Sequence, residues 1–243
     1  MRWRQNQRML FVLTLFCSCA LSVSARAQQL PDDPEDEKQL GLWLDQGVSV
    51  GLSGGKSLEV EAYERFDEGG ANLFEYFIQG GIGFRLSPWL QVIPFYRYQR
   101  FPNNPNTTYE NRLLLSTLVG RPQGAWRPNL RTIVEERFDE NRPATLRLRF
   151  RPGIDYALPV RAARPPVLVV NNEFFVVPGH NPFANGGSAF VQNRAQVGVR
   201  QAVTDTFSIR VFYMFQSVNL PTGWETNEIV GISLTFRKPR KTK

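Results

Sequence analysis

Alternating apolar and polar side chains dominate the chain from Trp43 to Phe236. The alternation runs for about ten residues at a time and is interrupted by short stretches rich in Gly, Pro, Asn or Asp. A period of two places successive side chains on opposite faces of a β-strand, whereas a helix repeats about every 3.6 residues. No segment of the sequence sustains the helical period. The pattern therefore predicts one all-β domain.

The alternating segments are the strands that we expect. They cover residues 43–52, 57–66, 73–85, 90–101, 109–119, 130–138, 145–157, 167–177, 189–203, 207–218 and 227–236. This set has an odd number of members, whereas single-chain bacterial barrels have even strand counts. We therefore favour about twelve strands, with a further strand around residues 40–44. About ten are expected instead if the first segment does not join the barrel.

The connections between these segments differ in length. Short connections are expected at 53–56, 87–88 and 204–206. Longer ones, richer in Gly, Pro and Asn, are expected at 67–72, 102–107, 139–144, 178–188 and 219–226, and they alternate with those at 123–128 and 159–166. Short turns at one end and longer loops at the other are typical of an up-and-down barrel in an outer membrane.

Each segment carries an apolar face and a charged face. In residues 145–157, for example, Leu146 and Leu148 alternate with Arg147 and Arg149. Alternation alone does not tell which face points inward, because a soluble barrel buries its apolar face and a membrane barrel exposes it to lipid. Two interpretations therefore remain: a membrane barrel, and a soluble periplasmic barrel that binds a hydrophobic ligand inside.

Three features favour the membrane barrel. The segments are long enough for a tilted crossing of a bilayer, whereas soluble strands cluster near about six residues. Aromatic side chains lie toward the ends of the apolar faces, as an interfacial girdle requires. These aromatic residues are Trp89, Tyr96, Tyr98, Phe207, Tyr213, Phe215 and Phe236. The polar faces carry charges of both signs. We therefore expect an up-and-down antiparallel transmembrane β-barrel of about 10–12 strands.

In such a barrel the charged faces line a narrow lumen, and each buried charge needs a partner. We expect a lumen-facing charge network in which arginines pair with glutamates from other strands. Its members are Glu59, Glu61, Arg65, Arg97, Glu110, Arg112, Arg131, Glu135, Arg137, Arg147, Arg149, Arg151, Arg194, Arg200 and Arg210.

The N-terminus has the features of a secretory signal peptide. Basic Arg2, Arg4 and Arg8 precede the apolar run 9–23, and Ala25-Arg26-Ala27 forms a small-x-small cleavage site. We expect a signal peptide at 1–27, a flexible acidic leader at 28–42, the barrel at 43–236 and a basic tail at 237–243. Both cysteines lie in the signal, so no disulfide is expected in the mature chain. Lipidation of Cys19 is an alternative, although the residues before it fit a lipobox poorly.

The net charge of +7 does not indicate nucleic-acid binding. Four of the basic residues lie in the expected signal peptide, and the tail holds more at Arg237, Lys238, Arg240, Lys241 and Lys243. The body between them is close to neutral. We therefore expect membrane lipid, lipopolysaccharide and the outer-membrane assembly machinery as partners. A last strand that ends on Phe236 resembles the assembly signal of outer-membrane proteins.

Several short motifs occur in a fixed order along the chain. They are Trp43, Glu64-Arg65-Phe66, Tyr96-Arg97-Tyr98, Glu135-Glu136-Arg137-Phe138, Leu146-Arg147-Leu148-Arg149, Asn172-Glu173-Phe174-Phe175 and Gln192-Asn193-Arg194. Their order resembles the family of exported bacterial proteins known as domain of unknown function 2490, which are predicted outer-membrane barrels. The resemblance covers about Trp43 to Phe236. It implies a barrel in the outer membrane and implies no activity.

No convincing catalytic constellation is present in the sequence. The single histidine, His180, lies in a Gly- and Pro-rich segment near Ser188, and a Ser–His lipid hydrolase at the rim of the barrel is the alternative that this pair leaves open. We expect no cofactor and no metal site. The function that we expect is a structural barrel or a narrow pore for small solutes in the outer membrane.

Overall fold

The computed structural model describes residues 40–104, 108–139, 142–178 and 187–239, which belong to one compact unit. Within these residues, the segments of alternating apolar and polar side chains form eleven strands. The strands are β1 Gly41–Gly51, β2 Lys56–Asp67, β3 Asn72–Ser87, β4 Leu90–Arg100, β5 Tyr109–Gly120, β6 Trp126–Asp139, β7 Arg142–Ala157, β8 Val167–Val176, β9 Phe190–Ala202, β10 Phe207–Leu220 and β11 Gly223–Lys238. A single turn of 3-10 helix, η1 Glu68–Gly70, lies between β2 and β3. In the described ranges, no helix is long and apolar enough to cross a membrane.

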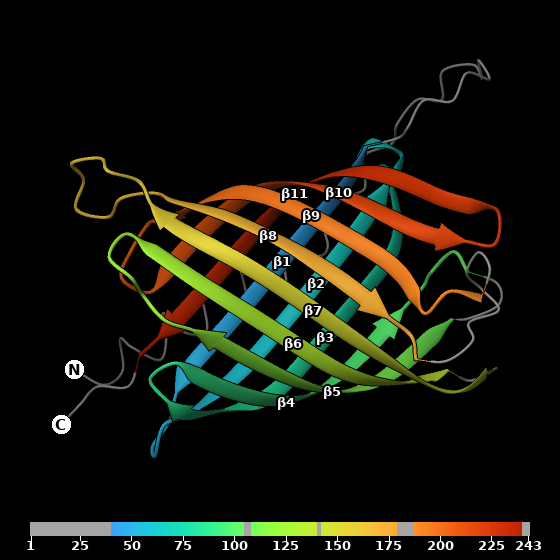
Figure 1. Ribbon diagram of the computed structural model, residues 1–243, viewed down its shortest axis with the longest axis horizontal. Helices are drawn as coiled ribbons and strands as arrows, with labels where there is room; N and C mark the ends of the chain where they lie inside the picture. The colour runs from blue at the N-terminus through green and yellow to red at the C-terminus, as the bar shows by residue number, and fades with distance from the viewer. Residues whose placement is uncertain (1–39, 105–107, 140–141, 179–186, 240–243) are drawn as a thin grey trace, which may run out of the picture. The chain divides into compact units, whose positions relative to one another are not determined.

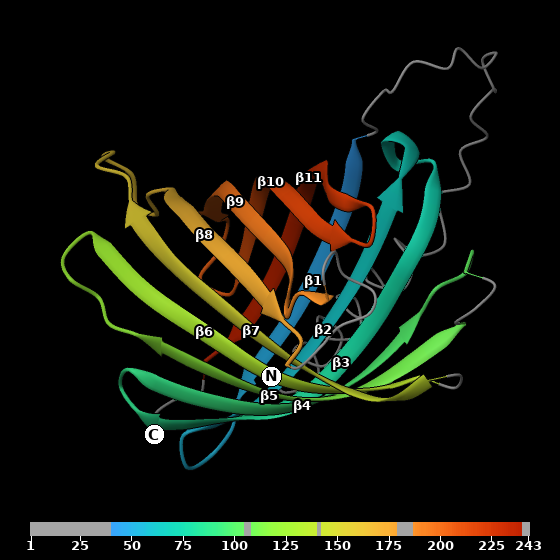
Figure 2. The ribbon, with the colours of Figure 1, turned by 45° about the vertical axis from the view of Figure 1, so that its right-hand side comes forward.

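The strands close into a barrel in which each strand pairs with the next along the chain. Figure 1 shows β6–β9 crossing in front of β1–β3, and Figure 2 shows the same wall curving around the lumen. All consecutive pairs are antiparallel, but β1 and β11 pair in parallel, with Gly41 opposite Ile229 and Val50 opposite Lys238. The reason is geometric: each hairpin reverses the direction of the chain, so an odd number of strands leaves the first and the last pointing the same way.

The expected β-barrel fold is confirmed, and the strand count is one below the favoured twelve. Every expected segment is a strand, and most bounds agree within two residues. The expected loops 139–144 and 219–226 are instead tight connections, since β6 ends at Asp139, β7 begins at Arg142, β10 ends at Leu220 and β11 begins at Gly223. The expected contrast between short turns and long loops is therefore weaker than the sequence suggested.

The polarity of the barrel is inverted relative to a soluble protein. Apolar side chains point outward, and Val211 in β10 keeps 53% of its surface exposed, whereas Glu135 in β6 points inward with 0% exposed. Small apolar clusters also lie inside the wall: one contains Trp43 and Phe212, and another contains Phe95. The charged faces thus fill the lumen, and the apolar faces cover the outside.

Glycines let large inward side chains lie flat against the wall. The ring of Phe212 in β10 covers Gly231 of the paired strand β11, and a Cβ atom built on Gly231 would lie 2.0 Å from the ring. Gly198 of β9 is the register partner of Phe212 on the other side of β10, and a Cβ atom built on it would lie 2.5 Å from the Val211 carbonyl oxygen and 2.7 Å from Phe212 Cβ. Phe212 therefore packs across three strands, and the two glycines are required by this close approach.

Candidate functional site

The lumen contains three chambers, arranged one after another along the barrel axis. We name the barrel ends by the strands: β1 begins at the N-terminal rim, and β11 ends at the C-terminal rim. The mouth chamber, about 710 Å³, lies at the C-terminal rim beside Trp89 and the turn residues Thr204 and Thr206. The central chamber, about 340 Å³, shares Arg151, Arg200 and other residues with the mouth chamber. The inner chamber, about 220 Å³, lies toward the N-terminal rim.

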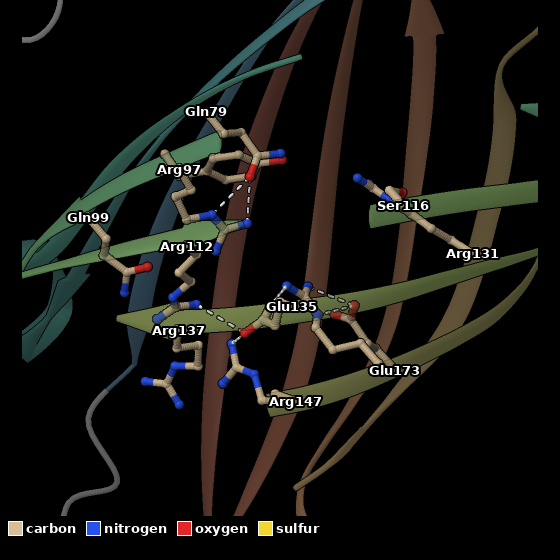
Figure 3. Close-up of polar contacts among 12 residues, drawn as sticks. Gln79, Arg97, Gln99, Arg112, Ser116, Arg131, Glu135, Arg137, Arg147 and Glu173 are labelled. Atoms are coloured by element: carbon tan, nitrogen blue, oxygen red, sulfur yellow. Dashed lines mark hydrogen bonds and ion pairs between the residues drawn. The ribbon is translucent and has the colours of Figure 1, made fainter. Parts of the chain in front are cut away.

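A dense network of ion pairs surrounds Glu135 on the side of the N-terminal rim (Figure 3). The Glu135 carboxylate pairs with Arg147, with Arg149 Nη1 at 3.2 Å and with Arg112 Nη1 at 3.5 Å. Arg149 also donates to Glu173 Oε1 at 2.7 Å. One carboxylate thus joins three arginines from β5 and β7, and each guanidinium has a negative partner, as buried charges require.

Glu110 extends this network through Arg112, and Glu75 forms a second cluster. Glu110 accepts from Arg112 Nε at 2.7 Å and from Arg137 Nε at 2.6 Å. Glu75 accepts from Arg65 Nη1 at 2.8 Å and from the side-chain amide of Gln99 at 2.6 Å. The Glu75 cluster bridges β2, β3 and β4 through side chains alone, and the Glu110 contacts bridge β5 and β6.

Arginines stack on aromatic rings between the central and inner chambers. We call this set the arginine–aromatic layer; its members are Trp43, Arg65, Phe77, Arg97, Arg149, Phe175 and Arg194. Arg97 lies 3.9 Å above the centroid of Phe77, and Arg194 lies 4.7 Å from that of Phe175. Cation–π contacts of this kind strengthen when water is excluded. Trp43 and the four arginines of the layer line both chambers, so the layer forms the boundary between them.

Carboxylates and arginines occupy different walls of the central chamber. Glu59 and Glu61 of β2 accept hydrogen bonds from neutral groups: Glu59 from Ser57, and Glu61 from Gln79 at 2.7 Å. Arg131 and Arg151 of β6 and β7 line the same chamber. Strands β2 and β6–β7 are separated by several strands in both directions around the barrel, so the two sets of charges face each other across the chamber.

The residues of the expected charge network all lie on the inward faces of their strands, in three kinds of environment. Ion pairs hold Arg65, Glu110, Arg112, Glu135, Arg137, Arg147, Arg149, Arg200 and Arg210. Hydrogen bonds to neutral side chains hold Glu59, Glu61, Arg97, Arg131 and Arg194. Arg151 alone lines the central and mouth chambers without a hydrogen bond or ion pair to a described residue.

Sequence reasoning missed several lumen residues. Those that carry the network are Trp43, Asp45, Glu75, Phe77, Gln79, Gln99, Glu173 and Phe175. Residues two apart in a strand share a face, and this rule would have placed Glu75 and Gln79 on one face with Phe77. The signal was obscured because apolar residues occupy both faces of β3 and β8, so Phe77 and Phe175 look no different from outward-facing neighbours.

The Ser–His pair of the hydrolase alternative is not brought together in the described residues, because His180 lies outside them. Ser188 Oγ accepts from the backbone N–H of Phe190 at 3.1 Å, which is a local turn contact. No group of three or more His, Cys, Asp or Glu side chains that could hold a metal ion is present in the part of the chain that the structure describes.

These features define a closed β-barrel with a charged lumen and an apolar outer face. Among solved structures, the chain is similar in fold to the NanC porin in a rhombohedral crystal form, with 9% identity and a TM-score of 0.50 over 82% of this chain and 98% of that one. The profile of the family described as "Protein of unknown function (DUF2490)" matches residues 40–227, and the chain belongs to this family. No curated protein matches the chain.

Proposed function

We propose that this chain is an outer-membrane β-barrel whose lumen forms a narrow passage for small polar solutes. The observation that carries the proposal is the inverted polarity of the barrel: exposed apolar rows such as Ile78, Leu113 and Val211 outside, and ion-paired charges such as Glu135 inside. Exposed apolar rows of this extent on a closed barrel suit contact with hydrocarbon, and a charged lumen suits water and ions.

The N-terminal sequence and the barrel together support the proposed location. A signal peptide at 1–27 directs the chain across the inner membrane, and the mature protein begins at Gln28. Membrane barrels leave no unsatisfied strand edge in lipid, which suits insertion into an outer membrane. Membrane lipid and lipopolysaccharide contact the outer face, and the assembly machinery recognises the last strand, which ends near Phe236.

The passage follows from the chambers. The central and inner chambers share Trp43 and the four arginines of the arginine–aromatic layer, and the central and mouth chambers share Arg151, Arg200 and Arg210. The boundaries between chambers are therefore made by side chains, which move on short time scales. A solute that crosses must be small and polar, because the layer is narrow and charged. The lumen offers little to the hydrophobic ligand of a soluble barrel.

Fractionation of cells that express the tagged chain tests the location. We expect the protein in the outer-membrane fraction, beginning at Gln28, and a shift of its gel mobility on boiling, because closed membrane barrels resist detergent until heated. Recovery of the protein in the periplasm, or retention of residues 9–24 in the mature chain, would contradict the proposed location.

Conductance in a planar lipid bilayer tests the passage. We expect small steps for the mature protein and larger steps for Trp43→Ala, which removes an aromatic side chain from the arginine–aromatic layer. Trp224→Ala is the matched control, because Trp224 is exposed on the outside of the barrel and lines none of the three chambers. Absence of conductance from all three proteins would leave a structural barrel as the function.

A further inference from the structure

Two arginines lie directly opposite each other on neighbouring strands of the central chamber. Arg131 in β6 and Arg151 in β7 are register partners, and both line this chamber. Side chains of such partners project from the same face of the sheet, with backbones about 5 Å apart. Like charges in this position repel each other and destabilise the strand pair. The arrangement therefore needs a compensating negative charge.

In the other opposed arginine pairs of the described strands, at least one arginine has an ion-pair partner. Arg97 and Arg112 are register partners on β4 and β5; Arg112 pairs with Glu110 and Glu135, and Arg97 donates to the neutral Gln79. Arg200 and Arg210 are register partners on β9 and β10, and they pair with Asp155 at 2.7 Å and with Asp45 at 3.6 Å. Arg112 and Arg137 are register partners on β5 and β6, and both pair with Glu110. In each of these pairs, at least one arginine thus has a carboxylate as its ion-pair partner.

No carboxylate forms an ion pair with Arg131 or Arg151 among the described residues. Glu173 of β8 lies near enough to attract Arg151, but its carboxylate is engaged by Arg149 at 2.7 Å. Arg131 Nε donates to the neutral Ser116 hydroxyl at 2.8 Å. Arg151 forms no hydrogen bond or ion pair with any residue in the described ranges. Most of the guanidinium N–H donors of the pair remain available inside a chamber that connects to the mouth of the barrel.

We propose that Arg131 and Arg151 form a binding site for an oxyanion, the carboxylate or phosphate group of a small solute. A guanidinium donates two parallel hydrogen bonds to such a group, and two adjacent guanidinium groups can hold both of its edges. The proposal deepens the proposed passage by naming its solute class, and it rests on that passage for its physiological meaning.

The opposite wall limits the class further. Glu59 and Glu61 face the pair across a chamber of about 340 Å³ and can accept hydrogen bonds from hydroxyl or ammonium groups. A solute that fits therefore carries an oxyanion at one end and donor groups at the other. Its size is that of a small hydroxy acid or sugar phosphate, because a chamber of this volume lies at the lower end of ligand pockets, about 300–1,000 Å³.

The mouth chamber has the charge that would attract an anion. Its lining contains more arginines than carboxylates. The arginines are Arg85, Arg127, Arg151, Arg200, Arg210 and Arg237, and the carboxylates are Asp155 and Asp205. A cleft lined mainly by one sign of charge raises the local concentration of the opposite ion. Anions entering at the C-terminal rim are therefore drawn toward the Arg131–Arg151 pair.

Thermal unfolding of the mature protein in detergent, titrated at constant ionic strength, tests the site. The probes are inorganic phosphate and lactate, with glycerol as the neutral control. We expect at least one of the two anions to raise the unfolding temperature in a saturable way, because a ligand of the folded state stabilises it. The anion that saturates at the lower concentration identifies the preferred group. Equal effects of phosphate, lactate and glycerol would overturn the proposal.

Variants assign the effect to the pair. In Arg151→Gln we expect binding about tenfold weaker, the change that follows the loss of charge-assisted hydrogen bonds. Arg127→Gln is the matched control, because Arg127 lines only the mouth chamber, and it should bind nearly as the unmodified protein does. Equal affinity in Arg151→Gln and the unmodified protein would mean adventitious ion binding only and would overturn the site.

The unliganded variants give a second, independent measurement. Arg151→Gln should unfold at a higher temperature than the unmodified protein in the absence of anions, because it removes the repulsion from Arg131. A lower unfolding temperature would overturn the proposal, since it would show that Arg151 has a structural role. Binding in detergent does not require conduction, so a failure of the passage and a failure of the site are distinguishable.

Discussion

Glu135 illustrates how single residues hold charges inside this barrel. Its carboxylate is fully buried and contacts three guanidinium groups. Glu135→Gln keeps the shape of the side chain but leaves those arginines without their shared negative partner. We expect a loss of about 3–5 kcal/mol in unfolding free energy, the usual cost of breaking a buried pair on one side. Denaturant unfolding in detergent measures it.

The control for this change is an ion pair at the surface. Arg164 pairs with the exposed Asp205 at 2.7 Å at the rim of the mouth chamber. Asp205→Asn should cost about 0–1 kcal/mol, because exposed pairs in water contribute little. Equal losses for Glu135→Gln and Asp205→Asn would mean that water and salt screen the Glu135 network as they screen a surface pair.

Gly231 tests the packing of the inner wall. A Cβ atom there would lie 2.0 Å from Phe212, so Gly231→Ala must displace a ring that is buried between three strands. We expect a loss of about 1–3 kcal/mol, as for other overpacked cores. Gly47→Ala on β1 is the matched control, because nothing lies within 4 Å of its Cβ position, and it should be neutral or slightly stabilising. Similar losses at both sites would show that the Phe212 contact does not limit the packing.

At the scale of the strand, alternation predicted the elements and their faces. In β7, for example, Leu148 and Phe150 point outward while Arg149 points inward, as the sequence indicated. A period of two is a property of each strand alone, so no knowledge of its neighbours is needed. The choice of the inward face required an added argument from strand length and charge.

The bounds that sequence missed lie where turn residues continue a strand. Residues 126–129 were expected to belong largely to a connection because of Gly124 and Pro128, yet Pro128 sits in β6 opposite Ile154. The segment 219–226 was expected to be a loop, yet only Pro221 and Thr222 lie outside β10 and β11. Cross-strand pairing overrides the local preference of such residues, and pairing is not visible in one strand.

The apolar row of β10 tests the orientation of the barrel. Val211 lies mid-strand on the outer face, so Val211→Arg would place a charge in hydrocarbon at about 2–4 kcal/mol if the row crosses a bilayer. We expect impaired assembly of this variant in cells. Ser208→Arg, on the opposite face near a turn, should assemble normally, and the ratio of folded protein on unboiled gels measures both.

A spin label decides whether lipid is the neighbour of this row. Labels at Val211 and Ile232, which are register partners on β10 and β11, should be accessible to oxygen dissolved in lipid and shielded from a water-soluble relaxing agent. If both labels are instead closed to either reagent, the outer face packs against protein, and the membrane orientation fails.

At the scale of the molecule, closure was the part that the sequence could not determine. The number of strands, the shear between them and the parallel pairing of β1 with β11 depend on contacts between residues far apart in the chain. The same holds for the ion-pair network. Alternation within β7 places Arg149 in the lumen, but its contacts with Glu135 and Glu173 depend on the register between strands. The alternation within a single strand contains no information on closure or on register.

The odd strand count makes a prediction about the two ends of the barrel. Leu40 precedes β1 at the N-terminal rim, and Pro239 follows β11 at the C-terminal rim. With eleven strands these residues lie at opposite rims of the barrel, whereas an even count would bring them to the same rim. In a barrel that spans the outer membrane, opposite rims face opposite sides of the membrane. Leu40→Cys and Pro239→Cys, each alone, test this, because we expect the mature chain to contain no other cysteine.

In intact cells, a maleimide that does not cross the outer membrane should label one of the two variants and spare the other. Permeabilised cells are the control, and both variants should be labelled there, which shows that each thiol is reactive. Labelling of both variants in intact cells, or of neither, would place the two rims on one side. The parallel β1–β11 pair could then not close the barrel, and β1 would have to leave the wall.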